Sequence, residues 1–240
     1  GVGPIARWRQ SPPIELVLKL KWAFAVSAIT AVIAPIVLRS WTPMIGFGFL
    51  VSAWIISSGI TQLVDRARIN PDRSWWQNLR IQPAGYYGML MAHFGVAVFI
   101  IGITAVRGFE TEQDVRMQVG GVSQSGGYDF QLVSLKTIAG PNYAAIQGHF
   151  DVSKNGKPVT SLYPEKRVYT ASQMPMTEAA IDSGITRDLY VSLGEPINEN
   201  EWSVRIYHKP FVDWIWGGCL LMALGGFLAI TDRRYRKKVA

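Results

Sequence analysis

The sequence has one cysteine, three histidines and long stretches without charge, and each scarcity limits what the chain can do. Cys219 alone cannot form an internal disulfide or a CxxC pair, so we expect a small apolar packing residue and no thiol redox chemistry by this chain alone. The sequence also lacks a Gly-rich phosphate loop, a Ser-His-Asp order and an HExxH pattern. Motif spacing therefore defines no activity.

Charged residues are missing from four segments of membrane-spanning length: 22–38, 41–64, 81–106 and 214–231. A helix of about 20 apolar residues crosses a bilayer. The first segment is short, but Lys19 and Lys21 lie at its end and can snorkel to the interface. The sequence therefore predicts a polytopic α-helical membrane protein with four transmembrane helices. Three lie in residues 1–106, at about 20–38, 41–64 and 83–106, and the last lies in 210–240 with a basic tail.

The net charge of +7 is divided unevenly along the chain. Residues 107–209 hold 10 Lys/Arg and 12 Asp/Glu, which leaves +9 to the remainder. Most of that excess lies in the N-terminal segment, the loop 65–80 and the tail after 232, which four spans place on one side. By the positive-inside rule that side is cytoplasmic. We expect both ends in the cytoplasm, residues 107–209 in the periplasm, a bacterial inner-membrane location and no nucleic-acid partner.

The polar region 107–209 has the pattern of a small all-β domain inserted before the last helix. The Asn155-Gly156 pair separates two apolar runs, which is the strongest short signal for a type I′ hairpin. Residues 176–184 are predicted to be a short helix. The predicted strands are 128–137, 144–153, 159–163, 189–193 and 202–207. About 100 residues are enough for one sandwich or barrel with its own core.

His93 lies near the centre of the charge-free segment 81–106. Ionisable groups at that depth are costly and mark functional or partnered sites. The imidazole could be a haem ligand, part of a proton relay or a structural hydrogen-bonding group, and the residues alone leave the three open. A neighbouring stripe of Gly88, Ala92 and Gly95 would let another backbone or a flat ligand approach closely.

The other candidate residues lie in the β domain. His149 and His208 have no Cys, His or acidic neighbour at zinc-ligand spacing, so surface or structural roles are expected. The cluster Glu165-Lys166-Arg167 is expected to be either a solvated turn or a docking site.

Several stretches resemble the C-terminal part of CcmF, the haem lyase family of bacterial cytochrome c maturation (system I). The similar segments run in order along the chain: 1–9 (GVGPIARWR), 87–97 (YGMLMAHFGVA), 163–167 (YPEKR), 176–182 (MTEAAID), 186–196 (TRDLYVSLGEP), 209–216 (KPFVDWIW) and 232–235 (DRRY). In that family two transmembrane histidines ligate a b-type haem, and His93 matches the second of them. The resemblance therefore implies that His93 is an axial ligand of haem iron and that the second ligand comes from outside this chain.

The resemblance also implies a reaction and partners. The family joins two cysteine thiols of an apocytochrome c to the haem vinyl groups; the chaperone CcmE delivers the haem and CcmH-type subunits handle the thiols. The family's WWD segment and its two flanking histidines are absent here, since Trp75-Trp76 lacks the surrounding pattern. We therefore expect no lyase activity from this chain without the remaining N-terminal part of the lyase, and no catalytic residue within it.

Two other readings stay open. The chain could be a non-enzymatic assembly or docking subunit in which His93 is structural. A third hypothesis, that the chain is half of a transporter, has less support, because the sequence shows neither clear helix breaks nor paired repeats. The opening Gly1-Val2-Gly3-Pro4 without an initiator Met is expected of a fragment or of one piece of a split gene.

Overall fold

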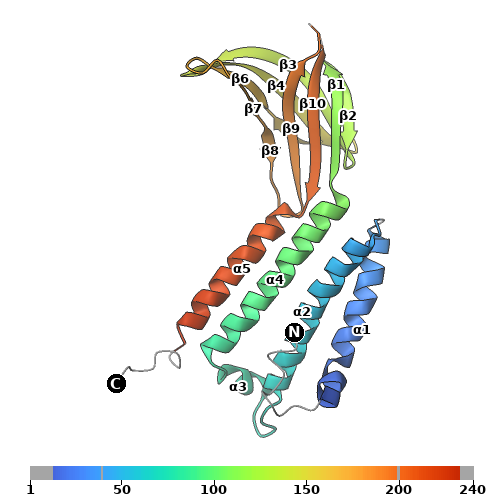
Figure 1. The fold of residues 1–240 in the computed structure, drawn as a ribbon, viewed down its shortest axis with the longest axis vertical. Helices are drawn as coiled ribbons and strands as arrows, with labels where there is room; N and C mark the ends of the chain where they lie inside the picture. Colours follow the sequence, from blue (N-terminus) through green and yellow to red (C-terminus); the bar gives the residue numbers. More distant parts are fainter. Residues whose placement is uncertain (1–12, 39, 199–200, 233–240) are drawn as a thin grey trace. The chain divides into compact units, whose positions relative to one another are not determined.

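The computed structural model describes residues 13–38, 40–198 and 201–232 (Figure 1). The expected inner segment 1–12 and the basic tail lie outside the described residues. The helices are α1 (Pro13–Val37), α2 (Pro43–Ala67), α3 (Trp75–Arg80), α4 (Ala84–Phe109) and α5 (Val212–Ile230). The strands are β1 (Thr111–Gln118), β2 (Val122–Ser125), β3 (Tyr128–Ala139), β4 (Tyr143–Lys154), β5 (Lys157–Leu162), β6 (Glu165–Tyr169), β7 (Pro175–Glu178), β8 (Ala180–Asp182), β9 (Arg187–Pro196) and β10 (Glu201–Pro210).

The chain divides into a helical unit, residues 1–108 with 213–240, and a β unit, residues 109–212. Within the described residues, α1, α2, α4 and α5 are long and apolar enough to cross a membrane. The predicted class is confirmed: membrane-length helices with a β domain inserted before the last of them.

Helices α1 and α2 form a hairpin held by small hydroxyl side chains. Thr42 caps α2 by accepting a hydrogen bond from the Ile45 amide, and Pro43 occupies the first turn, where no amide proton is needed. Ser57 of α2 donates to the Ala23 carbonyl of α1, and its oxygen lies 3.4 Å from that of Ser27. Such contacts hold helices together in lipid, where the hydrophobic effect does not.

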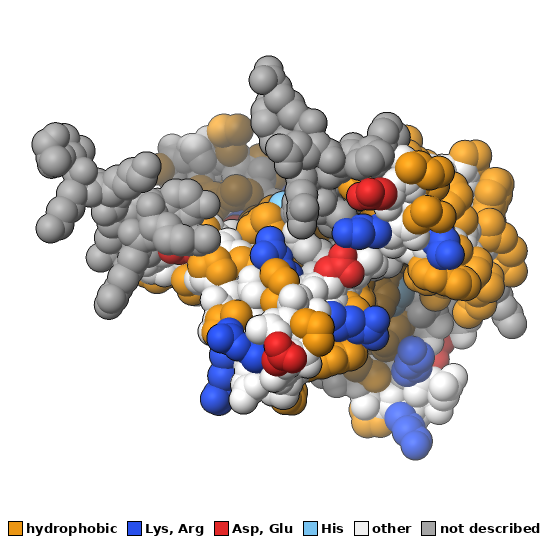
Figure 2. Space-filling view, turned by 90° about the horizontal axis from the view of Figure 1, so that it is seen from below, with side chains coloured by type: hydrophobic (Ala, Val, Ile, Leu, Met, Phe, Trp, Pro, Cys, Tyr) orange, Lys and Arg blue, Asp and Glu red, His pale blue; other side chains and the backbone are white. Residues whose placement is uncertain are grey.

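The short helix α3 was not predicted. It begins at a capping box, in which Ser74 and Gln77 satisfy each other's backbone amides. The fully buried Asn78 amide donates to the Ala67 and Asn70 carbonyls and so ties α3 to the end of α2. Figure 2 shows the end of the helical unit that carries α3, where Lys and Arg side chains gather.

The β unit is an antiparallel sandwich. One sheet has the order β1-β10-β9-β8; the other has the order β2-β3-β4-β6-β7, with β5 also paired to β4. Their inner faces form one core, whose fully buried members include Phe130, Leu132, Phe150, Leu189, Leu193, Val204 and Ile206.

All five predicted strands overlap observed ones, and the hairpin prediction is confirmed by positive φ at Asn155 (52°) and Gly156 (74°). The predicted helix at 176–184 is wrong. Residues there form β7 and β8, because β7 pairs with β6 and β8 pairs with β9. Pairing with neighbouring strands overrides the local preference of this short segment.

Candidate functional site

His93 is held by its own helix. Its Nδ1 lies 2.8 Å from the Met89 carbonyl oxygen, one turn earlier on α4. A carbonyl only accepts, so in the neutral ring Nδ1 carries the proton and Nε2 keeps a lone pair. An Nδ1–H bonded to a backbone carbonyl is the usual support of a metal-binding imidazole, because it fixes the tautomer and the ring orientation.

His93 also lines a small polar hollow between α2 and α4. The hollow has a volume of about 10 Å³ and is lined by Ile55, Ser58, Gly59, Gln62, Met89, Leu90 and His93. Ligand pockets are usually about 300–1,000 Å³, so a porphyrin does not fit inside this hollow. The described residues thus fit one axial ligand of a haem but do not enclose the macrocycle.

The small-residue stripe beside His93 faces α5. A Cβ added to Gly88 would lie 2.5 Å from the Gly225 carbonyl oxygen, and one added to Gly95 would lie 2.8 Å from that of Gly218. The predicted close approach is therefore made by the backbone of another helix. This seam leaves the stripe no room for a flat ligand.

Asp232, just beyond α5, caps the start of α4. Its carboxylate accepts a hydrogen bond of 2.8 Å from the Gly85 amide, and only 5% of the residue is exposed. A negative charge at a helix N-terminus is stabilised by the amides left without helical partners there. Asp232 thus fixes the start of the helix that carries His93.

His149 belongs to an exposed cluster that is not a nucleophilic triad. Its Nε2 lies 3.1 Å from Asp151 Oδ1, and the Ser161 hydroxyl donates to the same oxygen at 2.7 Å. A triad requires the serine to donate to the histidine. Here both bond to the aspartate, and the imidazole stacks on Tyr163, 4.8 Å between ring centroids.

His208 is half-buried in the sandwich beside two cations. Its Nδ1 has no hydrogen-bond partner among the described residues, and its ring stacks on Tyr128 with centroids 5.6 Å apart. Burial lowers the pKa of His208, and the charges of Lys154 and Arg187 lower it further. The expected structural role is consistent with this setting.

The lowered pKa of His208 predicts an acid-sensitive sandwich. The unfolded chain, with an ordinary pKa of about 6.5, binds the proton first. The stability contribution is therefore full above about pH 6.5 and is lost as the pH falls through 6.5 toward the lower folded value. Thermal unfolding of the sandwich in the detergent-solubilised chain should show this loss, and His208→Phe should remove it. An identical pH profile for His149→Phe and His208→Phe would contradict this assignment.

Glu165 and Arg167 lie in β6 and not in a turn. Arg167 donates to Glu165 at 2.7 Å and lies 3.2 Å from Glu178, and Gln147 donates to Glu165 at 2.8 Å. Burial raises the pKa of Glu165, but the hydrogen bonds from Arg167 and Gln147 outweigh it and hold the pKa below its ordinary value. The predicted solvated turn is replaced by an ordered polar network.

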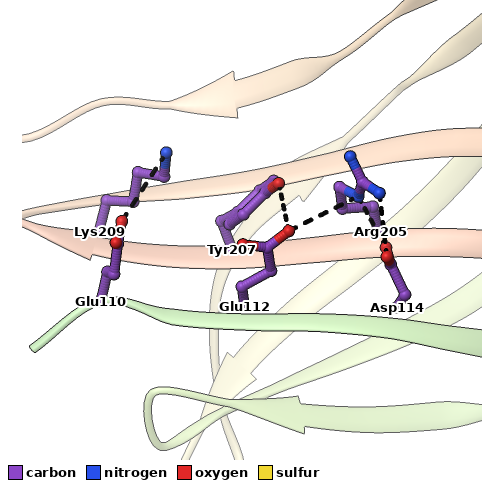
Figure 3. Close-up of polar contacts among 6 residues, drawn as sticks. All are labelled: Glu110, Glu112, Asp114, Arg205, Tyr207 and Lys209. Atoms are coloured by element: carbon purple, nitrogen blue, oxygen red, sulfur yellow. Dashed lines mark hydrogen bonds and ion pairs between the residues drawn. The ribbon is translucent and has the colours of Figure 1, made fainter. Parts of the chain in front are cut away.

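A second polar network pins the register of β1 against β10 (Figure 3). Arg205 makes a two-pronged bond to Asp114, at 2.7 and 2.9 Å, and Tyr207 donates to Glu112 at 2.7 Å. The hydrogen bond from Arg205 lowers the pKa of Asp114. A slip of one residue would turn these partners to opposite faces, so the network selects a single pairing.

The helices and the inserted sandwich define a multi-pass membrane protein with a β-sandwich domain. A family model described as "CcmF C-terminal beta-sandwich" matches residues 108–210. "Cytochrome c-type biogenesis protein CcmF" of Pseudomonas aeruginosa is 42% identical over 99% of this chain and 36% of its own length. The Escherichia coli protein of the same name is 39% identical over 100% of the chain and 36% of its own.

A solved structure, "Cytochrome c Heme Lyase CcmF", has the same fold, with a TM-score of 0.74 at 18% identity over 96% of this chain and 37% of its own. The chain belongs to the CcmF family of cytochrome c biogenesis proteins. It spans about a third of the length of these relatives.

Proposed function

We propose that the chain is the C-terminal portion of a membrane haem lyase that attaches haem covalently to apocytochrome c. In this proposal His93 supplies one axial ligand to a resident b-type haem, and a second ligand comes from the remaining N-terminal part of the lyase. The observation that carries the proposal is the Nδ1 contact to the Met89 carbonyl, which leaves Nε2 free to bind iron.

The chain's own residues would position that ligand. Met89 holds the imidazole, Asp232 anchors the start of α4, and the glycine seam locks α4 against α5. A b-type haem bound at His93 would supply one-electron chemistry at a potential that the axial ligand and its burial tune. A ligand on a packed helix keeps its geometry better than one on a loop.

The sandwich is proposed to be the docking domain, with CcmE, a CcmH-type subunit or apocytochrome c as partner. The ordered network around Glu165 and Arg167 supports this, because its side chains are fixed before any partner arrives. If docking were the chain's whole role, with His93 structural, the chain would be a non-enzymatic assembly subunit. That is the alternative.

Haem attachment in cells separates the two proposals. The chain would be produced together with the N-terminal part of a CcmF relative in a strain that lacks its own CcmF. We expect covalent haem on a reporter cytochrome c, detected by haem staining, and its loss with His93→Ala. Unchanged attachment with His93→Ala, together with loss when Glu165 and Arg167 are both replaced by alanine, would favour the docking subunit.

The proposed orientation places the sandwich in the periplasm and both chain ends in the cytoplasm. Its basis is the positive charge of the segments flanking the spans. In a Cys219→Ser background, a cysteine at exposed Lys136 of β3 should react with a membrane-impermeant maleimide in intact cells. A cysteine at exposed Arg73, before α3, should react only after permeabilisation. The reverse pattern would overturn the orientation.

A further inference from the structure

Gln62 of α2 is a polar side chain that is almost buried in the helical unit. Only 7% of it is exposed, and its side-chain amide makes no hydrogen bond within the described part of the chain. It lies one turn after Ser58, and both side chains line the hollow that His93 also lines. An amide without a hydrogen bond is costly in an apolar setting, and most of all inside a bilayer, and the hollow is a place where this amide can find a partner.

The size and the chemistry of the hollow match one water molecule. A cavity needs about 10–15 Å³ to hold a water, and the hollow has about 10 Å³. A buried water also needs about two to four polar partners. Gln62 offers two donors and an acceptor, and Ser58, which donates to the Ile55 carbonyl at 3.2 Å, keeps lone pairs free.

The third polar partner is the imidazole edge of His93. Met89 and His93, which share the Nδ1 contact, both line the hollow. The Met89 carbonyl also receives the regular helical bond from the His93 amide, four residues later. Because that carbonyl is shared, the Nδ1–H can use a second acceptor.

We propose that one water in this hollow joins Gln62 and Ser58 of α2 to the Nδ1–H of His93, and that Gln62 is a positioning residue for this histidine. The inference rests on the proposed function and deepens it. The water would be a second acceptor for Nδ1–H, which makes Nε2 a better electron donor to iron. A more basic axial ligand favours the oxidised haem and lowers its potential.

The test is a redox titration of the haem in the complete lyase, followed by visible absorbance. Gln62→Leu removes the amide at similar volume, so the potential should rise. The redox equilibrium should shift about three- to tenfold, where tenfold is about 59 mV for one electron. Ser58→Ala, which disturbs packing less, should shift the potential the same way by a smaller amount.

Ser57→Ala is the matched control, because Ser57 faces α1 and does not line the hollow. It should leave the potential unchanged. If the Gln62→Leu protein does not accumulate in the membrane, the potential measured for Ser58→Ala tests the inference in its place. The inference alone would be overturned if Gln62→Leu and Ser58→Ala kept the haem spectrum but left the potential unchanged or lowered it. In that outcome His93→Ala would still abolish the spectrum, so the ligand role would stand. If His93→Ala leaves the spectrum intact, the ligand role fails, and the inference fails with it.

Discussion

Replacing Gly225 with alanine is expected to weaken the packing of α4 against α5, whereas the same replacement at Gly226 is not. A Cβ at Gly225 would lie 2.5 Å from the Ala92 amide nitrogen and 2.6 Å from the Gly88 carbonyl oxygen, but one at Gly226 meets nothing within 4 Å. The obstructing atoms are backbone, so no side-chain rotation relieves the clash. Overpacking of this kind costs about 1–3 kcal/mol.

The neighbouring pair is a strong control because both positions lie in the same helix and gain the same side chain. Alanine favours a helix over glycine by about 1 kcal/mol, so Gly226→Ala should be neutral or stabilising. The difference in stability can be measured by unfolding each variant in mixed detergent micelles. The reaction of Cys219, which lies in α5, with a thiol reagent reports when this helix separates. The same comparison can be made two helical turns earlier in α5, between Gly217→Ala and Gly218→Ala. Of these two positions, only Gly218 would bring its new Cβ against α4. Equal stability of the two variants within each pair would contradict close backbone packing of α5 against α4 at these glycines.

The second large effect is expected at His93. Replacing it with alanine should remove one iron ligand and lower the b-haem content of the complete assembly, because no other described residue of the hollow carries an imidazole. Added imidazole should restore part of the haem signal if the protein around the missing side chain stays intact. Rescue of this kind separates a lost ligand from a misfolded helix.

The other two histidines provide controls for this experiment. His149 bonds to Asp151 in the sandwich, and His208 stacks on Tyr128 there. Alanine at either position should leave the b-haem spectrum unchanged. A loss at all three positions would indicate general damage and would count against a specific role for His93.

Much of the fold follows from sequence patterns with a single physical cause. Charge-free length predicts the spans because lipid excludes charge, and the Asn155-Gly156 pair predicts a hairpin because both residues tolerate positive φ. The predicted helix at 176–184 fails because β6 and β9 supply partners for β7 and β8 that no local window contains. The short helix α3 was missed because its capping box spans only four residues.

The candidate site is only partly visible in the sequence. His93 is conspicuous as an isolated imidazole in an apolar run, but its bond to Met89 and its neighbour Gln62 depend on how α2 and α4 pack. The sequence does carry a signal for Gln62, because this polar residue stands four positions after Ser58 and therefore on the same face of a mostly apolar helix. No sequence pattern indicates the capping role of Asp232, because its partner Gly85 lies far away in the sequence.

Haem-iron binding by His93 is tested most directly by the reduced-minus-oxidised visible spectrum of the complete membrane assembly carrying His93→Ala. It should be recorded beside the wild type at equal protein amount. If His93 binds the iron, the b-type haem bands should disappear or change strongly in the variant. Bands unchanged in position and intensity would contradict iron binding by His93.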